Sequence, residues 1–115
     1  MNIQQLRPLH VLVFREAEWW IAQCLEFDLA AHASTMEELV YEFEKTLVGT
    51  FVVSHENGLP GLDHLPPAPE VYSKLFMQAV MRVGAQVRPR FQGPLNIPPA
   101  FMIPEIRMRM QERIN

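Results

Sequence analysis

The sequence predicts an α+β fold, in which a three-stranded antiparallel meander carries one packed helix and is followed by a second helix and an irregular proline-rich C-terminal tail. Three observations predict it. Three short stretches rich in branched and aromatic residues follow one another between residues 9 and 33. A long segment with apolar residues at three- and four-residue spacing comes next. Nine of the ten prolines lie at or after Pro60, where they discourage regular structure.

The first two predicted strands span 9–15 and 19–27, and a polar turn joins them. A third, shorter strand spans 29–33, and short links between all three favour an antiparallel meander. Side chains alternate between the two faces of a strand. In the first strand, Leu9, Val11 and Val13 therefore share one face, and Leu12 and Phe14 share the other. In the second, Trp19, Ile21, Leu25 and Phe27 oppose Trp20, Ala22 and Cys24. Both faces of the sheet are consequently apolar.

The clearest element is a helix over 35–56. Ser34 and Thr35 are typical N-cap residues, and the glutamates at 37 and 38 complete two overlapping capping boxes. Asn57-Gly58 supplies a left-handed stop. One face of this helix is an apolar stripe made by Met36, Leu39, Val40, Phe43, Leu47 and Phe51.

The region after residue 58 is less regular. Proline and glycine make 59–69 a linker, and a second amphipathic helix is expected over 70–83. Residues 106–114 are compatible with a strand, because arginine and methionine alternate there, or with a short helix. The predicted organisation is one domain at 1–58, the linker at 59–69, and a helix with an irregular basic tail at 70–115 that is not an independent domain.

Composition and charge limit the function classes. The 115 residues carry a net charge of −3, divided into an acidic part up to residue 70 and a basic part after it. The negative total disfavours general nucleic-acid binding, although the arginines of the basic tail (82, 88, 90, 107, 109 and 113) leave phosphate contacts open as an alternative. A single cysteine, no long apolar run and no secretory leader indicate a cytoplasmic protein that does not enter a membrane.

The stretch 20–47, WIAQCLEFDLAAHASTMEELVYEFEKTL, resembles the N-terminal domain of HicB-family antitoxins and HicB-like proteins. The similarity consists of an aromatic-led strand, a short strand and a helix opening with STMEEL, and it extends over about half of the chain. It implies a partial ribonuclease-H-like β-β-β-α fold. It also implies a toxin–antitoxin system in which the domain binds and occludes a HicA-type mRNA interferase. Residues 59–115 lack the DNA-binding module that such antitoxins carry.

Catalysis is not expected from this sequence. Glu26 and Asp28 would share a strand face, as a residual nuclease of ribonuclease-H-like ancestry would need, but no third carboxylate accompanies them. The four histidines and Cys24 lack metal-ligand spacing, and Cys24 lies within a strand as a small hydrophobic residue. We therefore predict a non-enzymatic protein with no catalytic residues, no cofactor and no metal site.

The candidate partner-binding residues are two tryptophans and the polar side of the long helix. Trp19 and Trp20 point to opposite faces, so only one can join the helix-covered core, and the other lies at an interface or under the proline-rich arm. The acidic residues Glu37, Glu38, Glu42 and Glu44 would meet the basic surface of an RNA-cleaving toxin.

Self-association is the alternative function, with the protein as an orphan module. One helix can cover only one of the two apolar sheet faces. The second helix or a second copy must cover the other, and a proline-stiffened linker favours a helix that reaches outward. The sequence therefore predicts a homodimer.

Overall fold

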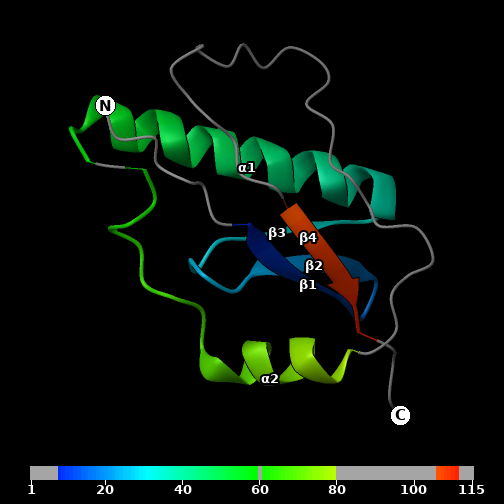
Figure 1. Cartoon of the computed structure of the whole chain (residues 1–115). Coiled ribbons are helices and arrows are strands. Elements are labelled where there is room, and N and C mark those ends of the chain that lie inside the picture. Colours follow the sequence, from blue (N-terminus) through cyan, green and yellow to red (C-terminus); the bar gives the residue numbers. More distant parts are fainter. Residues whose placement is uncertain (1–7, 60, 80–105, 112–115) are drawn as a thin grey trace.

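The computed structural model describes residues 8–59, 61–79 and 106–111 (Figure 1). The predicted α+β class and the β-β-β-α start are confirmed. The elements, in chain order, are β1 (Leu9–Glu16), β2 (Trp19–Cys24), β3 (Ala30–Ala33), α1 (Met36–Glu56), α2 (Glu70–Gln78) and β4 (Ile106–Met110).

The sheet has four strands in the order β3-β2-β1-β4, so the expectation of three strands was one short. β1 pairs antiparallel with β2, and β2 pairs antiparallel with β3. β4 lies parallel to β1, from Leu9 opposite Ile106 to Val13 opposite Met110. The choice left open for 106–114 is thereby decided in favour of a strand over 106–110. The apolar residues at alternate positions of β4 reach the main core, as a half-buried strand requires.

β2 is shorter than predicted, because it ends at Cys24 and not at residue 27. The chain turns immediately afterwards, and the backbone N–H of Cys24 donates to the carbonyl of Leu29 at 2.8 Å. The strand alternation therefore stops before Phe27. Phe27 packs against the core under α1, on the face opposite to the one predicted.

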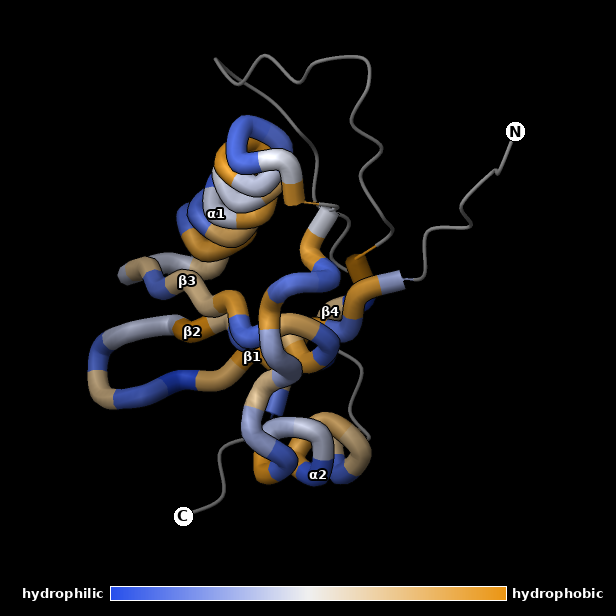
Figure 2. The backbone as a smooth tube through the Cα atoms, turned by 90° about the vertical axis from the view of Figure 1, so that its left-hand side faces the viewer, coloured by the Kyte–Doolittle hydropathy of each residue, from blue (hydrophilic) through white to orange (hydrophobic). Residues whose placement is uncertain are grey.

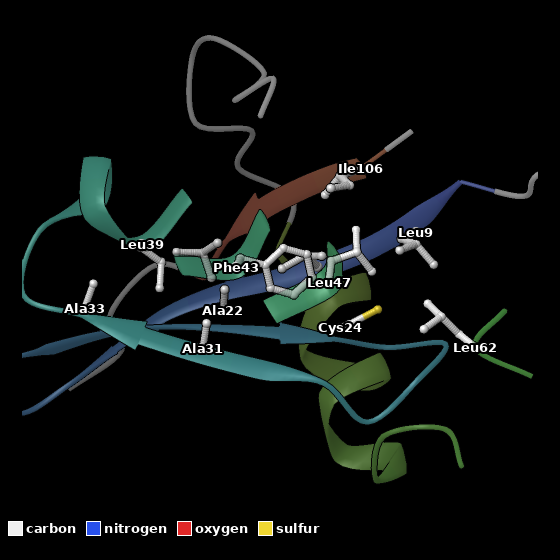
Figure 3. Packing of buried hydrophobic residues seen from close by; sticks show 12 residues of the cluster. Leu9, Ala22, Cys24, Ala31, Ala33, Leu39, Phe43, Leu47, Leu62 and Ile106 are labelled. Carbon is white, nitrogen blue, oxygen red and sulfur yellow. The ribbon is translucent and has the colours of Figure 1, made fainter. Parts of the chain in front are cut away.

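α1 lies across β3 and β2 on one face of the sheet, which separates it from α2 on the other face (Figure 2). Its inward side chains Leu39, Phe43 and Leu47 are fully buried and point toward the small residues of β2 and β3 (Figure 3). The predicted cap is present, since the backbone N–H of Glu38 donates to the Thr35 hydroxyl at 3.2 Å. Gly58, with φ of 71°, supplies the left-handed residue after the helix.

The linker folds back along the turn that follows β2 and does not direct the second helix outward, contrary to expectation. The backbone N–H of Asp28 donates to the carbonyl of Pro66 at 2.7 Å, and that of Ala68 donates to the carbonyl of Leu25 at 3.0 Å. Leu62 enters the core on the α1 side. These contacts bring α2 beneath β1, where a second core cluster forms from Leu12, Phe76 and Ala79 with Phe14, Leu25, Tyr72 and Leu75.

α2 ends at Gln78, and Ala79 is its C-cap. The rest of the helix predicted over 70–83 lies outside the described residues, as does most of the predicted irregular tail. Neither of the two described helices is long and apolar enough to cross a bilayer.

Candidate functional site

The β1–β2 turn and the start of α1 lie at the same end of the sheet. Trp20 stands opposite Ala33 in the sheet, and the chain enters α1 three residues after Ala33. The hairpin turn contributes exposed Glu16 and Glu18 to this end. The first turn of α1 contributes Glu37 and Glu38, which are also exposed. The register of the meander therefore brings four carboxylates to the end of the sheet that also carries the two tryptophans, and we call this region the acidic end.

The two tryptophans divide between the faces of the sheet as predicted. Trp20 packs against the core under α1, and the Arg15 guanidinium lies 5.3 Å from its ring centroid. Trp19 is on the opposite face, is 44% exposed, and meets the His32 ring edge-on with centroids 5.1 Å apart. Trp19 is therefore the member of the pair whose ring is available to a partner.

The acidic face of α1 is smaller than the sequence indicated. Glu37 and Glu38 are exposed, and Glu42 accepts a hydrogen bond from the Lys45 ammonium at 3.0 Å. Glu44 is not part of this face, since it is only 1% exposed. Its Oε1 has no hydrogen-bond partner among the described residues, and burial raises the pKa of its carboxyl to about 7.

The prediction for Glu44 was wrong because the buried sector of α1 is wider than the assigned stripe. Val48, one turn further along the helix, is also buried. Val40 and Val48 flank Glu44 at a spacing of four residues, so the sequence does contain a second apolar row at this side of the helix. The two valines at this spacing were the sequence signal that Glu44 lies on a buried side of α1.

An open pocket of about 420 Å³ lies between α2 and the sheet, and sequence reasoning did not find it. It contains a hydrogen-bonded pair, His10 of β1 and Glu26 of the turn after β2. Glu26 Oε1 accepts the backbone N–H of His10 at 2.8 Å, and Glu26 Oε2 lies 2.6 Å from His10 Nδ1. The residues that line the pocket are His10, Leu25, Glu26, Ser73, Phe76, Met77 and Arg109.

Arg109 brings a positive charge to this pocket. The parallel register of β4 sets Arg109 opposite Leu12, whose side chain lies in the core cluster between α2 and the sheet. The guanidinium carbon is 4.5 Å from the Phe76 ring centroid, and Nη1 donates to the Phe76 carbonyl at 3.4 Å. No carboxylate pairs with Arg109 among the residues that the structure describes. The arginine–methionine alternation of 106–110 was the only sequence signal for its position.

The residues considered for catalysis do not assemble into a nuclease site. Glu26 turns toward His10, whereas Asp28 accepts a hydrogen bond from the Gln23 side chain at 2.9 Å. Within 8–59, 61–79 and 106–111, no three His, Cys, Asp or Glu residues are grouped as a metal site would require. Cys24 is fully buried, and desolvation is the main cause that raises the pKa of its thiol to about 11. Cys24 is therefore protonated at neutral pH.

From these positions we expect no metal-dependent cleavage of nucleic acids. RNA, DNA and RNA–DNA hybrid incubated with the protein in Mg²⁺ or Mn²⁺ should stay intact, because the two acids bind different side chains, no third metal-ligating residue joins them among the described residues, and two-metal catalysis needs converging carboxylates. Gel electrophoresis of the products is the measurement. Cleavage that Asp28→Ala abolishes would contradict this expectation.

Comparison with known proteins finds no matching family model, no matching curated protein and no matching solved structure.

Proposed function

We propose that the protein is a non-enzymatic binding module of the HicB-like kind, which uses its acidic end to bind and occlude a basic protein partner such as a HicA-type mRNA interferase. The observation that carries the proposal is the exposed Trp19 ring at the end of the sheet where four exposed glutamates also lie, Glu16 and Glu18 in the hairpin and Glu37 and Glu38 at the start of α1. Exposed tryptophans are frequent centres of protein interfaces. The resemblance of 20–47 to HicB-family antitoxins supports the choice of partner.

Charge complementarity supports a basic partner. Arg15 is a cation at this end of the sheet, and its guanidinium is held over the Trp20 ring. The four glutamates of the acidic end therefore outnumber the positive charge around them. A partner that cleaves RNA must attract phosphates, and so it carries a basic surface. Opposite charges would speed the encounter, while burial of the Trp19 ring would slow dissociation.

A catalytically inactive HicA-type interferase is the probe that tests this proposal. Isothermal titration calorimetry should detect binding, and Trp19→Ala should weaken it about tenfold or more. The double variant Glu37→Gln/Glu38→Gln should lower the association rate, most clearly at low ionic strength. Neither variant removes a residue from the buried core.

The matched control neutralises two exposed glutamates away from the acidic end, Glu56→Gln/Glu70→Gln. It removes the same net charge but should leave the affinity and the association rate unchanged. Absence of binding by the unmodified protein, or equal loss in the control and in Glu37→Gln/Glu38→Gln, would contradict the proposal.

One observation favours self-association as a second candidate function. β3 is an edge of the described sheet, and the face beside it is only partly covered, since Ala30 and His32 are exposed and the exposed Trp19 ring packs against His32. α2 covers the β1 side of that face and leaves this strip open. An uncovered edge strand with apolar neighbours favours pairing with a second copy.

Sedimentation equilibrium at micromolar concentration should therefore give about twice the chain mass of 13.3 kDa. Ala30→Lys places a charge on the edge strand and should shift the equilibrium toward monomer. Ser73→Lys on α2 adds the same charge elsewhere and should not. A mass of one chain at all concentrations would show that α2 and the linker cover enough of the sheet by themselves.

A further inference from the structure

We propose that the pocket between α2 and the sheet binds a small organic acid, in which a carboxylate pairs with Arg109 and an aromatic or branched body lies against Leu25, Phe76 and Met77. This site is independent of the proposed function. His10 stands near the start of β1, whereas the acidic end adjoins the hairpin at the other end of that strand.

Arg109 is the group that selects an anion. Its guanidinium is partly buried on an aromatic ring, where water screens its charge less than at an open surface. The Phe76 carbonyl and ring occupy only part of its hydrogen-bonding capacity, since a guanidinium has five N–H donors. A carboxylate matches the remaining donors in geometry and in charge, and can bind two of them at once.

Glu26 also lines the pocket, but it repels an anionic ligand less than an unpaired carboxylate would. Each of its two oxygens already contacts His10, one at the backbone N–H and one at the ring Nδ1. These contacts hold the Glu26 carboxylate against β1. They also fix the His10 ring, which meets the Phe76 ring edge-on with centroids 5.5 Å apart. The pair thus forms a rigid wall of the pocket.

The apolar residues determine what the rest of the ligand must be. Phe76 is buried where α2 packs against the sheet, and Leu25 belongs to the same cluster. Met77 is 74% exposed and also lines the pocket, so its flexible side chain can close over a bound molecule. The volume of about 420 Å³ lies within the usual range of small-molecule sites. A compact aryl or branched alkyl acid has the size and polarity that these walls require.

The test uses 4-phenylbutyrate and its neutral amide as probes with the full chain. In ¹H–¹⁵N correlation spectra, titration with the acid should shift the amides of Leu25, Glu26, Phe76, Met77 and Arg109 in a saturable way. The neutral amide should bind about tenfold more weakly, because it lacks the charge that pairs with the guanidinium. The phosphate monoester of 4-phenylbutanol, as a third probe, separates a preference for carboxylate from a preference for any anion.

Two substitutions examine the site from different elements. Arg109→Gln should weaken binding of the acid about tenfold and bring it to the level of the amide. Because this change also removes the contact with Phe76, Met77→Glu provides a second measure, in which a negative charge at the exposed rim should repel the acid. Gln78→Glu adds the same charge at the next position of α2, outside the pocket lining, and should bind the acid as the unmodified protein does.

Several results would overturn the proposal. They are the absence of saturable shifts in the millimolar range, equal affinity for the acid and the amide, and equal effects of Met77→Glu and Gln78→Glu. Tighter binding of the phosphate monoester than of the acid would overturn the assignment of a carboxylate. Loss of the acidic-end interaction would not affect these measurements, because they use no protein partner.

Discussion

Phe43→Ala is expected to lower the free energy of unfolding by about 3–5 kcal/mol. The Phe43 side chain is fully buried at the centre of the inward side of α1. The facing residues Ala22 and Ala31 are too small to fill the space that a removed ring would leave (Figure 3). The cost therefore includes both the lost burial of the ring and a residual cavity. Urea denaturation followed by far-UV circular dichroism measures the change.

Val53→Ala is the matched control for this prediction. Val53 lies on the same helix but is 58% exposed, so its truncation should change the free energy of unfolding by less than about 0.5 kcal/mol. If Phe43→Ala were as mild as Val53→Ala, the inward side of α1 would be wrongly assigned.

Glu44→Gln is expected to remove most of the loss of stability that the protein shows as pH rises from about 5 to about 8. Burial raises the pKa of Glu44 from 4.5 to about 7 in the folded protein. Between these two values the folded state holds a proton that the unfolded state has released. The stabilisation from that proton is complete below pH 4.5 and is lost as pH rises through about 7.

The size of the effect follows from the shift in pKa. Each unit corresponds to about 1.4 kcal/mol, so ionised Glu44 costs on the order of 3 kcal/mol of stability at pH 8. Glutamine has nearly the same shape and carries no charge, and the variant should be the more stable protein at pH 8. Urea titrations at several pH values give the slope. Desolvation causes the shift, so the pH dependence of stability should persist at high salt.

Glu42→Gln is the corresponding control on the same helix. Glu42 is paired with Lys45 near the surface, and such pairs contribute about 1 kcal/mol or less. This variant should keep the pH dependence of the unmodified protein. A Glu44→Gln variant with an unchanged slope would show that Glu44 is not the group responsible.

The local parts of the fold were predictable because their causes are local. Alternation in β1 placed Val11 and Val13 on one face and Leu12 on the other, and the structure confirms this division: the two valines lie in the core under α1, and Leu12 lies in the cluster between α2 and the sheet. The cap of α1 followed from Thr35 and the glutamate three residues later. Each of these assignments depends only on residues that are a few positions apart in the sequence.

The remaining parts depend on contacts between distant segments. Alternation over 106–110 is compatible with a strand, but no residue there specifies β1 as a parallel neighbour. The pocket is lined by residues 10, 26, 76 and 109, which are distant in the sequence. They lie close together only because β4 pairs with β1 and the linker places α2 against the sheet. Glu44 was assigned by its charge, whereas its environment is set by how much of α1 is covered. The type of an individual residue does not reveal which distant segment will pack against it.

The parallel pairing of β4 with β1 has a consequence for biosynthesis. β1, β2, β3 and α1 all leave the ribosome well before residue 106, so the meander can assemble while one side of β1 still lacks its neighbour. Closing so long a loop is entropically slow, and the high contact order of this step delays it further. Until β4 arrives, the nascent chain presents the backbone of β1 to any other strand, and this interval is when misassembly is most to be expected.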